Sequence, residues 1–294
     1  MTELRFNELR GEQVAYAAHR QDRTLHPGPE GCPFCPGSSE LPVDSFEIAV
    51  LQNRFPAFDA SEVVVYTEDH ESSFGTLPLE RAEALMWVWR DRYRELGARP
   101  DVAYVLIFEN RGALVGATLD HPHGQIHGYP FVPPVPAAER AADERRGSCV
   151  PCALVSEERR SGERVVIAGD AVSAYVPYAA RWPYEVHVAP LEHRTSLLDC
   201  DRAELRELAE ALQRVARGYD ALWGEPLPYM MVLHQAPTDG HGGGHLHAEF
   251  YTPLRAPGIP KYLASGEQGG GTFTVDVLPE RAAAELRAAV ERAG

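Results

Sequence analysis

The chain has 294 residues, and 28 lysines and arginines stand against 43 aspartates and glutamates, so its net charge is −15. Hydrophobic residues make up 44% and charged residues 24%, which excludes disorder as the main state and allows a sizeable core. A surface this acidic repels phosphate backbones, so we expect no nucleic-acid partner. The polar N-terminus, and the lack of any apolar run of about 18 residues, predict a soluble, cytoplasmic protein with no membrane partner.

Two long segments have apolar residues at spacings of three and four, which predicts amphipathic helices. Each is followed by strand-like runs and a turn, and a proline-rich, then charged stretch lies between the two copies. In chain order, the predicted elements are a helix over 80–96, a strand over 102–110, a connection over 131–147, a helix over 203–223, strands over 229–235 and 245–251, and a last helix over 279–293. In the first copy, a second strand is expected after the turn at 110–112 and is expected to end at the histidines 121–123.

The strand–turn–strand ends of both copies predict antiparallel pairing. We therefore expect an α+β fold, with helices packed over an antiparallel sheet. The prolines of 131–147 predict a boundary between two parts of the chain, one over 1–135 and the other over 136–294.

Four of the five cysteines form two Cys-x-x-Cys pairs, Cys32 with Cys35 and Cys149 with Cys152. An odd number of cysteines without a signal peptide disfavours a disulfide framework, so the pairs are candidates for metal ligands or redox centres. Prolines flank the first pair, which favours a metal-binding knuckle. The fifth, Cys200, starts a predicted helix and is expected to be structural.

Histidines follow the two cysteine pairs at repeated distances. The first cysteines of the two pairs, Cys32 and Cys149, are 117 residues apart. The histidines that follow them are 123 residues apart at His70 and His193, and 124 apart at His121 and His245. This repeat indicates an internal duplication of the chain.

Two thiolates and two imidazoles form a tetrahedral set that suits zinc, and four protein ligands make such a site structural. The sets are Cys32, Cys35, His70 and His121, and Cys149, Cys152, His193 and His245. The alternative is solvent-facing cysteines with unrelated histidines, which the repeated spacing disfavours.

The tract His121-Pro122-His123-Gly124-Gln125 contains a second imidazole beside the proposed metal ligand. Gly124 leaves room for a ligand to approach the backbone, and Gln125 can donate amide hydrogens to an oxyanion. An imidazole can attack phosphorus and form a covalent phosphoramidate, so His123 is a candidate nucleophile.

This tract resembles the active-site motif of the galactose-1-phosphate uridylyltransferases, the nucleotidyl-transferase branch of the histidine-triad superfamily. The resemblance covers nearly the whole chain. Its segments are RFN at 5–7, HRQDR at 19–23, GCPFCPG at 31–37, QNRFP at 52–56, DH at 69–70, FENRG at 108–112, VPYAARWPYEVHVAP at 176–190, HQAP at 234–237, LHAEFY at 246–251 and KY at 261–262.

The resemblance implies two histidine-triad-like halves and a ping-pong transfer of uridine monophosphate between UDP-glucose or UDP-galactose and hexose 1-phosphates. His123 would be the nucleophile, with Gln125 at the phosphoryl oxygens and about two zinc ions per chain. The implied nucleotide contacts are Arg20, Arg23, Asn53, Asn110 and Thr118. Lys261 and Glu267 would contact the hexose phosphate of the neighbouring subunit in a homodimer.

Two departures from the family pattern leave alternatives open. Some members have a second metal site of one glutamate and three histidines, and the matching positions are Glu139, His234, His247 and Glu249. Because Glu249 is not a histidine, we favour the second cysteine set instead. The segment 266–273 does not align securely, which leaves the hexose open. The alternative functions are adenylyl transfer or phosphorolysis within the same superfamily, and a zinc-stabilised binding module without catalysis.

Overall fold

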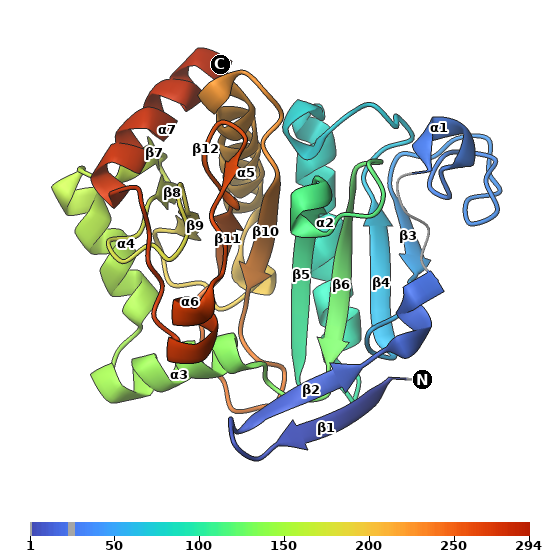
Figure 1. The fold of residues 1–294 in the computed structure, drawn as a ribbon, viewed down its shortest axis with the longest axis horizontal. Helices are drawn as coiled ribbons and strands as arrows, with labels where there is room; N and C mark the ends of the chain where they lie inside the picture. Colours follow the sequence, from blue (N-terminus) through green and yellow to red (C-terminus); the bar gives the residue numbers. More distant parts are fainter. Residues whose placement is uncertain (1, 23–26) are drawn as a thin grey trace.

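The computed structural model describes residues 2–22 and 27–294. Within these residues, nine strands form one sheet in the order β3-β4-β6-β5-β10-β11-β9-β8-β7, and every neighbouring pair is antiparallel. The strands are β3 (Ala49–Gln52), β4 (Ala60–Val65), β5 (Tyr104–Arg111), β6 (His123–Tyr129), β7 (Val165–Ala168), β8 (Val172–Tyr175), β9 (Val186–Pro190), β10 (Tyr229–His234) and β11 (His247–Tyr251). The predicted α+β fold with an antiparallel sheet is confirmed (Figure 1).

The two halves of the chain meet at the centre of this sheet, where β5 pairs with β10. The residue pairing also repeats between the halves. Phe108 lies opposite Gln125 in the first half, and Val232 lies opposite Glu249 in the second, so both partners are displaced by 124 residues. The predicted duplication is therefore present in the strand register. The predicted boundary between residues 135 and 136 falls inside a helix and stays a prediction.

Helices α2 (Leu79–Gly97) and α5 (Arg202–Trp223) pack side by side on one face of the sheet (Figure 1). Both begin and end close to where the sequence predicts. Helix α5 starts at Asp201, whose carboxylate accepts from the backbone N–H of Glu204 at 2.9 Å, while the Glu204 carboxylate accepts from the N–H of Asp201. It ends at Gly224, whose φ of 78° suits a left-handed cap.

The core lies between these helices and the sheet, and its largest fully buried side chains are aromatic. They include Trp89 on α2, Tyr219 on α5, and Tyr104, Tyr229 and Phe250 on the strands. Hydrogen bonds connect the two halves of the chain across the same layer. The Gln213 amide on α5 donates to the carbonyl oxygens of Phe74 and Leu77, at 3.0 and 2.8 Å.

The remaining elements lie around the sheet. They are β1 (Glu3–Asn7), β2 (Glu12–Tyr16), η1 (Ala18–Asp22), α1 (Gly28–Gly31), η2 (Phe74–Thr76), η3 (Ala113–Val115), α3 (Pro134–Arg146), α4 (Val150–Ser161), η4 (Leu197–Asp199), β12 (Leu254–Ala256), β13 (Ile259–Pro260), α6 (Ser265–Gly270) and α7 (Pro279–Ala293). No helix among residues 2–22 and 27–294 has the length and apolar composition needed to cross a membrane.

Two local expectations differ from the structure. The connection over 131–147 contains helix α3, because its prolines occupy the first turn, where a missing N–H costs nothing, and good helix formers follow. The strand expected to end at residues 121–123 instead begins at His123, so β6 extends away from the tract. The glycines 112 and 116, with φ of 90° and 80°, turn the backbone around η3 before this strand.

Candidate active site and metal sites

His123 is the first residue of β6, which lies between β4 and β5 in the sheet. Its Nδ1 lies 2.7 Å from the carbonyl oxygen of His121. A carbonyl can only accept, so Nδ1 carries the proton and Nε2 keeps its lone pair. Burial lowers the pKa of His123, which favours the neutral ring. The backbone therefore presents a neutral imidazole with an unprotonated Nε2, the form that a nucleophile requires.

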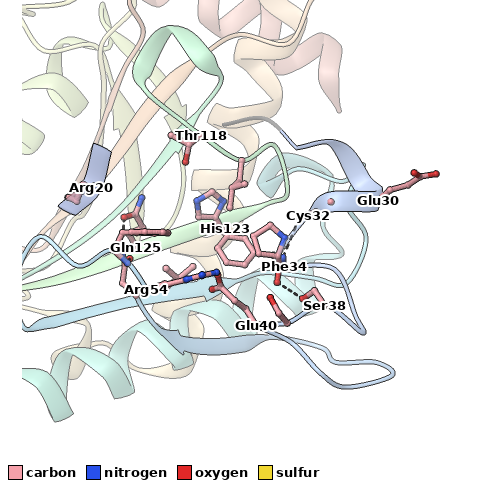
Figure 2. A pocket seen from close by; sticks show the side chains of 17 residues that line it. Arg20, Glu30, Cys32, Phe34, Ser38, Glu40, Arg54, Thr118, His123 and Gln125 are labelled. Carbon is pink, nitrogen blue, oxygen red and sulfur yellow. Dashed lines mark hydrogen bonds and ion pairs between the residues drawn. The ribbon is translucent and has the colours of Figure 1, made fainter. Parts of the chain in front are cut away.

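A cavity of about 350 Å³ opens beside His123 (Figure 2). Four of the predicted substrate-contacting residues line it, namely Arg20, Asn53, Thr118 and Gln125, as does the predicted metal ligand Cys32. The Asn53 amide donates to the Gln125 side-chain oxygen at 3.4 Å, which leaves the Gln125 amide nitrogen available to an oxyanion. The structure thus brings together residues from η1, the end of β3, the loop before β6 and β6 itself.

The other predicted contact residues are placed differently. Asn110 lies on β5, and its side chain is on the same face of the sheet as that of Gln125. This follows because Phe108, two residues before Asn110, pairs with Gln125. Arg23 lies outside the described residues. Lys261 and Glu267 do not line this cavity. They pair with each other at 2.9 Å beside α6, on the C-terminal half of the molecule (Figure 1).

The cavity is also lined by residues for which no role was predicted, among them Phe34, Glu40 and Arg54. The Phe34 ring, between the two cysteines of the first knuckle, lies 5.1 Å from the His123 ring. Arg54 and Glu40 form an ion pair of 3.6 Å on the wall that Figure 2 shows below His123. The sequence could have indicated Phe34, because it lies between two candidate metal ligands. A metal bound by these cysteines and by His121 would hold the Phe34 side chain close to His123.

The first predicted zinc set converges beside this cavity. Cys32 Sγ lies 3.7 Å from His121 Nδ1, and Cys35 Sγ lies 3.5 Å from His70 Nδ1 and 3.6 Å from His121 Nδ1. Tetrahedral zinc, with its usual bond lengths to sulfur and nitrogen, places such ligand atoms about 3.6 Å apart. His121 Nε2 lies 2.7 Å from the Thr67 carbonyl oxygen, an outer contact that orients the ring. The donors and their spacing fit zinc.

The second predicted set has the same arrangement in the other half. Cys152 Sγ lies 3.4 Å from His193 Nδ1 and 3.2 Å from His245 Nδ1, and Cys149 Sγ lies 3.6 Å from the latter. Burial raises the pKa of the Cys152 thiol to about 12, so a metal ion would have to displace its proton. This set also fits zinc.

A third group of possible ligands lies where the duplication places a counterpart of the active site. His247 and Glu249 occupy the positions of His123 and Gln125, and His247 Nδ1 lies 2.8 Å from the His245 carbonyl oxygen. Its Nε2 lies 3.5 Å from the Glu249 carboxylate. The group consists of Glu139, His234, His247 and Glu249, with ligand atoms all within 4.8 Å of one another. The sequence interpretation treated this group and the second cysteine set as alternatives, but both are assembled in the structure.

Comparison with known proteins matches both halves of the chain to one family. The model of the galactose-1-phosphate uridyl transferase N-terminal domain matches residues 56–133, and that of the C-terminal domain matches residues 139–293. A galactose-1-phosphate uridylyltransferase of Thermotoga maritima is 37% identical over 98% of both chains. One from Streptomyces lividans is also 37% identical, over 97% of this chain and 86% of that protein.

Solved structures agree with this result. One described as a uridylyltransferase is 34% identical, with a TM-score of 0.87 over 99% of both chains. An ADP-glucose phosphorylase from Arabidopsis thaliana with bound ADP-glucose has a TM-score of 0.76 at 20% identity over 98% of both chains, and shares the fold alone. On these matches, which span nearly its whole length, the chain belongs to the galactose-1-phosphate uridylyltransferase family.

Proposed function

We propose that this chain transfers uridine monophosphate between UDP-glucose and galactose 1-phosphate through a covalent uridylyl-histidine at His123. The proposal rests on the orientation and the environment of the His123 ring. Its Nδ1 is anchored to the His121 carbonyl, and the ring lines a cavity with polar walls. Family membership supplies the substrates, because the relatives reported above are named for this activity.

In the first half-reaction, His123 Nε2 attacks the α-phosphorus of UDP-glucose. A P–N bond forms, the P–O bond to the β-phosphate breaks, and glucose 1-phosphate leaves with the electron pair. In the second, a phosphate oxygen of galactose 1-phosphate attacks the same phosphorus. The P–N bond then breaks, UDP-galactose leaves, and His123 returns to its starting form. Imidazole suits both steps because it is a good nucleophile and a good leaving group near neutral pH.

Charge on the transferring group is stabilised by fixed donors in this proposal. The Gln125 amide nitrogen is free to donate because its oxygen accepts from Asn53. Arg20 and Arg23 supply positive charge for the two phosphates, and Asn53, Asn110 and Thr118 contact the nucleotide. A few local cations suffice on a chain whose net charge is −15, since charge-assisted bonds to phosphate are strong and short.

The two Cys-Cys-His-His sets would each hold one structural zinc. Zinc in such a four-ligand site stabilises the fold and leaves the chemistry to the side chains. The group around His247 and Glu249 has the donors for a further ion. Elemental analysis of the purified chain tests the count of two, and a third equivalent that is lost in Glu249→Gln would place an additional ion there.

The covalent intermediate is tested by mass spectrometry of the intact chain. Incubation with UDP-glucose, without galactose 1-phosphate, should increase the mass by one uridylyl group. ADP-glucose serves as the parallel arm, and an adenylyl adduct in place of the uridylyl adduct would assign the chain to adenylyl transfer. No adduct with either sugar nucleotide would overturn the covalent mechanism.

His123→Gly identifies the nucleophile. The variant should form no adduct and lose the overall transfer, because no other imidazole in the described residues lines the cavity. Added imidazole should fit the space that the side chain leaves and restore uridylyl transfer to a free imidazole acceptor. Gln125→His is the companion variant, which should keep the fold and lower the rate. Full transfer by His123→Gly without added imidazole would remove His123 from the mechanism.

A further inference from the structure

A polar group lies on the face of the sheet opposite the cavity, directly behind the active-site strand. Glu109 on β5 points into the aromatic layer between the sheet and the helices and is 4% exposed. The hydroxyl of Tyr229 donates to Glu109 Oε1 at 2.9 Å. Among the described residues, neither Glu109 Oε2 nor the Tyr66 hydroxyl makes a hydrogen bond, and both atoms are fully enclosed. Two unsatisfied polar atoms in one apolar layer require an explanation, since each is costly to bury alone.

Tyr66 connects this group to the active site. Its backbone N–H donates to the carbonyl oxygen of Pro122 at 3.1 Å, and its hydroxyl lies behind Gly124. The contact is close, because a Cβ at Gly124 would lie only 2.3 Å from the Tyr66 hydroxyl oxygen. Gly124 is flanked by His123 and Gln125. The phenol therefore supports the short stretch of backbone from which both of these side chains project.

The Glu109 carboxyl can satisfy Tyr66 in either charge state, because a carboxyl oxygen accepts from a phenol O–H. Burial raises the pKa of Glu109 to about 7, against the opposing effects of the Tyr229 hydroxyl, the Arg111 guanidinium and the Tyr66 hydroxyl. Arg111 is itself paired with Asp220 on α5 at 2.7 Å, so Asp220 already compensates most of its positive charge. Burial also raises the pKa of Tyr66, which keeps its phenol neutral. Tyr66, Tyr229 and Arg111 are the titratable groups that act on this carboxyl.

We propose that Glu109 is a positioning residue whose carboxyl accepts a hydrogen bond from the Tyr66 hydroxyl, which holds this phenol behind Gly124 and so fixes the backbone that presents His123 and Gln125. Glu109 faces away from the cavity and touches no substrate in this proposal. The inference rests on the roles proposed above for His123 and Gln125. It accounts for both unsatisfied atoms, because Tyr66 and Glu109 each act on the pKa of the other, which indicates that the two groups are close enough to bond.

The first test compares two phenylalanine variants that each remove a hydroxyl from the same carboxyl. Tyr66→Phe should lower kcat about tenfold to hundredfold, with little change in KM for UDP-glucose, because the reacting imidazole is displaced by a fraction of an ångström. Tyr229→Phe is the matched control, since Tyr229 does not reach Gly124. It should show a similar fall in Tm and keep its kcat. Equal kcat values in the two variants would overturn the proposal.

The second test replaces the carboxyl itself. Glu109→Gln keeps a side-chain oxygen that can accept from the Tyr66 hydroxyl, so its kcat should be close to wild type. Glu109→Leu removes this acceptor and should lower kcat about as much as Tyr66→Phe, with little change in KM for UDP-glucose. Equal kcat values in Glu109→Leu and Glu109→Gln would overturn the role of this carboxyl.

The two proposals fail in different ways. If His123 is not the nucleophile, the wild-type chain forms no uridylyl adduct and His123→Gly stays active, whatever the Glu109 and Tyr66 variants do. If only the positioning role is wrong, the adduct forms normally and Tyr66→Phe matches Tyr229→Phe. Should Glu109→Gln not fold, as judged by its zinc content and Tm, the comparison of the two phenylalanine variants decides alone.

Discussion

Gly124 shows how closely the residues around His123 are packed. An added Cβ would lie 2.3 Å from the Tyr66 hydroxyl oxygen and 3.2 Å from the Phe108 carbonyl oxygen. Gly124 is required here because a larger residue would not fit in the space behind the strand. A motif that allows any residue between the histidine and the glutamine omits this requirement. Gly128, further along the same face of β6, is packed against Ala60 in a similar way.

We predict that Gly124→Ala lowers kcat at least about tenfold, because relief of the contact must move either Tyr66 or the strand that carries His123. Gly128→Ala is the matched control, since its Cβ would lie 2.7 Å from the Cβ of Ala60. Both variants should lose about 1–3 kcal/mol of unfolding free energy through overpacking. Chemical denaturation and steady-state kinetics on both variants test this, and a kcat loss in Gly128→Ala as large as that in Gly124→Ala would contradict it.

His123 and His247 show that one residue type in one local setting can serve two chemistries. Both follow a candidate zinc ligand by two residues, and both have Nδ1 within 2.8 Å of that ligand's carbonyl oxygen. The His123 ring lines a cavity, whereas Nε2 of His247 lies 3.5 Å from the carboxylate of Glu249. The first can attack an electrophile, and the second is restricted to holding a proton or an ion.

At the scale of elements, the Cys32–Cys35 knuckle connects a candidate metal site to the candidate active site. Its two sulfurs reach His70 and His121, and the Phe34 ring between them packs 5.1 Å from the His123 ring. The second knuckle, at the start of α4, has no such neighbour among the described residues that line the cavity. Two sites with the same ligands are therefore expected to differ in what they support.

We predict that Cys35→Ser removes one zinc equivalent and lowers kcat at least about tenfold, because Phe34 and His121 lose their anchor. Cys152→Ser should also remove one equivalent and lower Tm, since bound metal contributes to the folding free energy, but it should keep most of its kcat. Zinc content, Tm and kcat measured on the same preparations check both expectations. The idea is wrong if Cys152→Ser loses as much activity per folded chain as Cys35→Ser.

At the scale of the whole molecule, the predicted substrate contacts occupy two separate places. Lys261 is 7% exposed and donates to Glu267, and this pairing holds the pKa of Glu267 at about 2. Both residues lie apart from the cavity beside His123. If they bind the hexose phosphate, a second chain must bring them to the site, which is the reason to propose a homodimer with shared sites. A two-fold dimer is also the commonest oligomer on general grounds.

The prediction is tested by complementation between two inactive chains. His123→Gly and Lys261→Ala are each expected to be inactive as homodimers. In a mixed dimer, one of the two sites regains both intact residues, so activity should rise to about a quarter of the wild-type value at random exchange, where half the dimers are mixed. Native mass spectrometry verifies the mixed dimers. Their presence without recovered activity would mean that each chain builds its own site.

Patterns in the sequence predicted the helices α2, α5 and α7, the strands β5, β10 and β11, the duplication and the grouping of both cysteine–histidine sets, whereas the strand expected to end at residues 121–123 was misplaced. Periodicity and spacing report which residues share a face, and a tetrahedral metal needs few other conditions. Helix α3 was missed because prolines at a helix start look like those of a loop. Only the tertiary structure decided that β5 pairs with β10, that Phe34 lies against His123, that Tyr66 lies behind Gly124, and that Glu109 is buried without a partner for one carboxyl oxygen. These contacts join residues distant in the chain, and their energies depend on burial and on atomic positions that no local pattern contains.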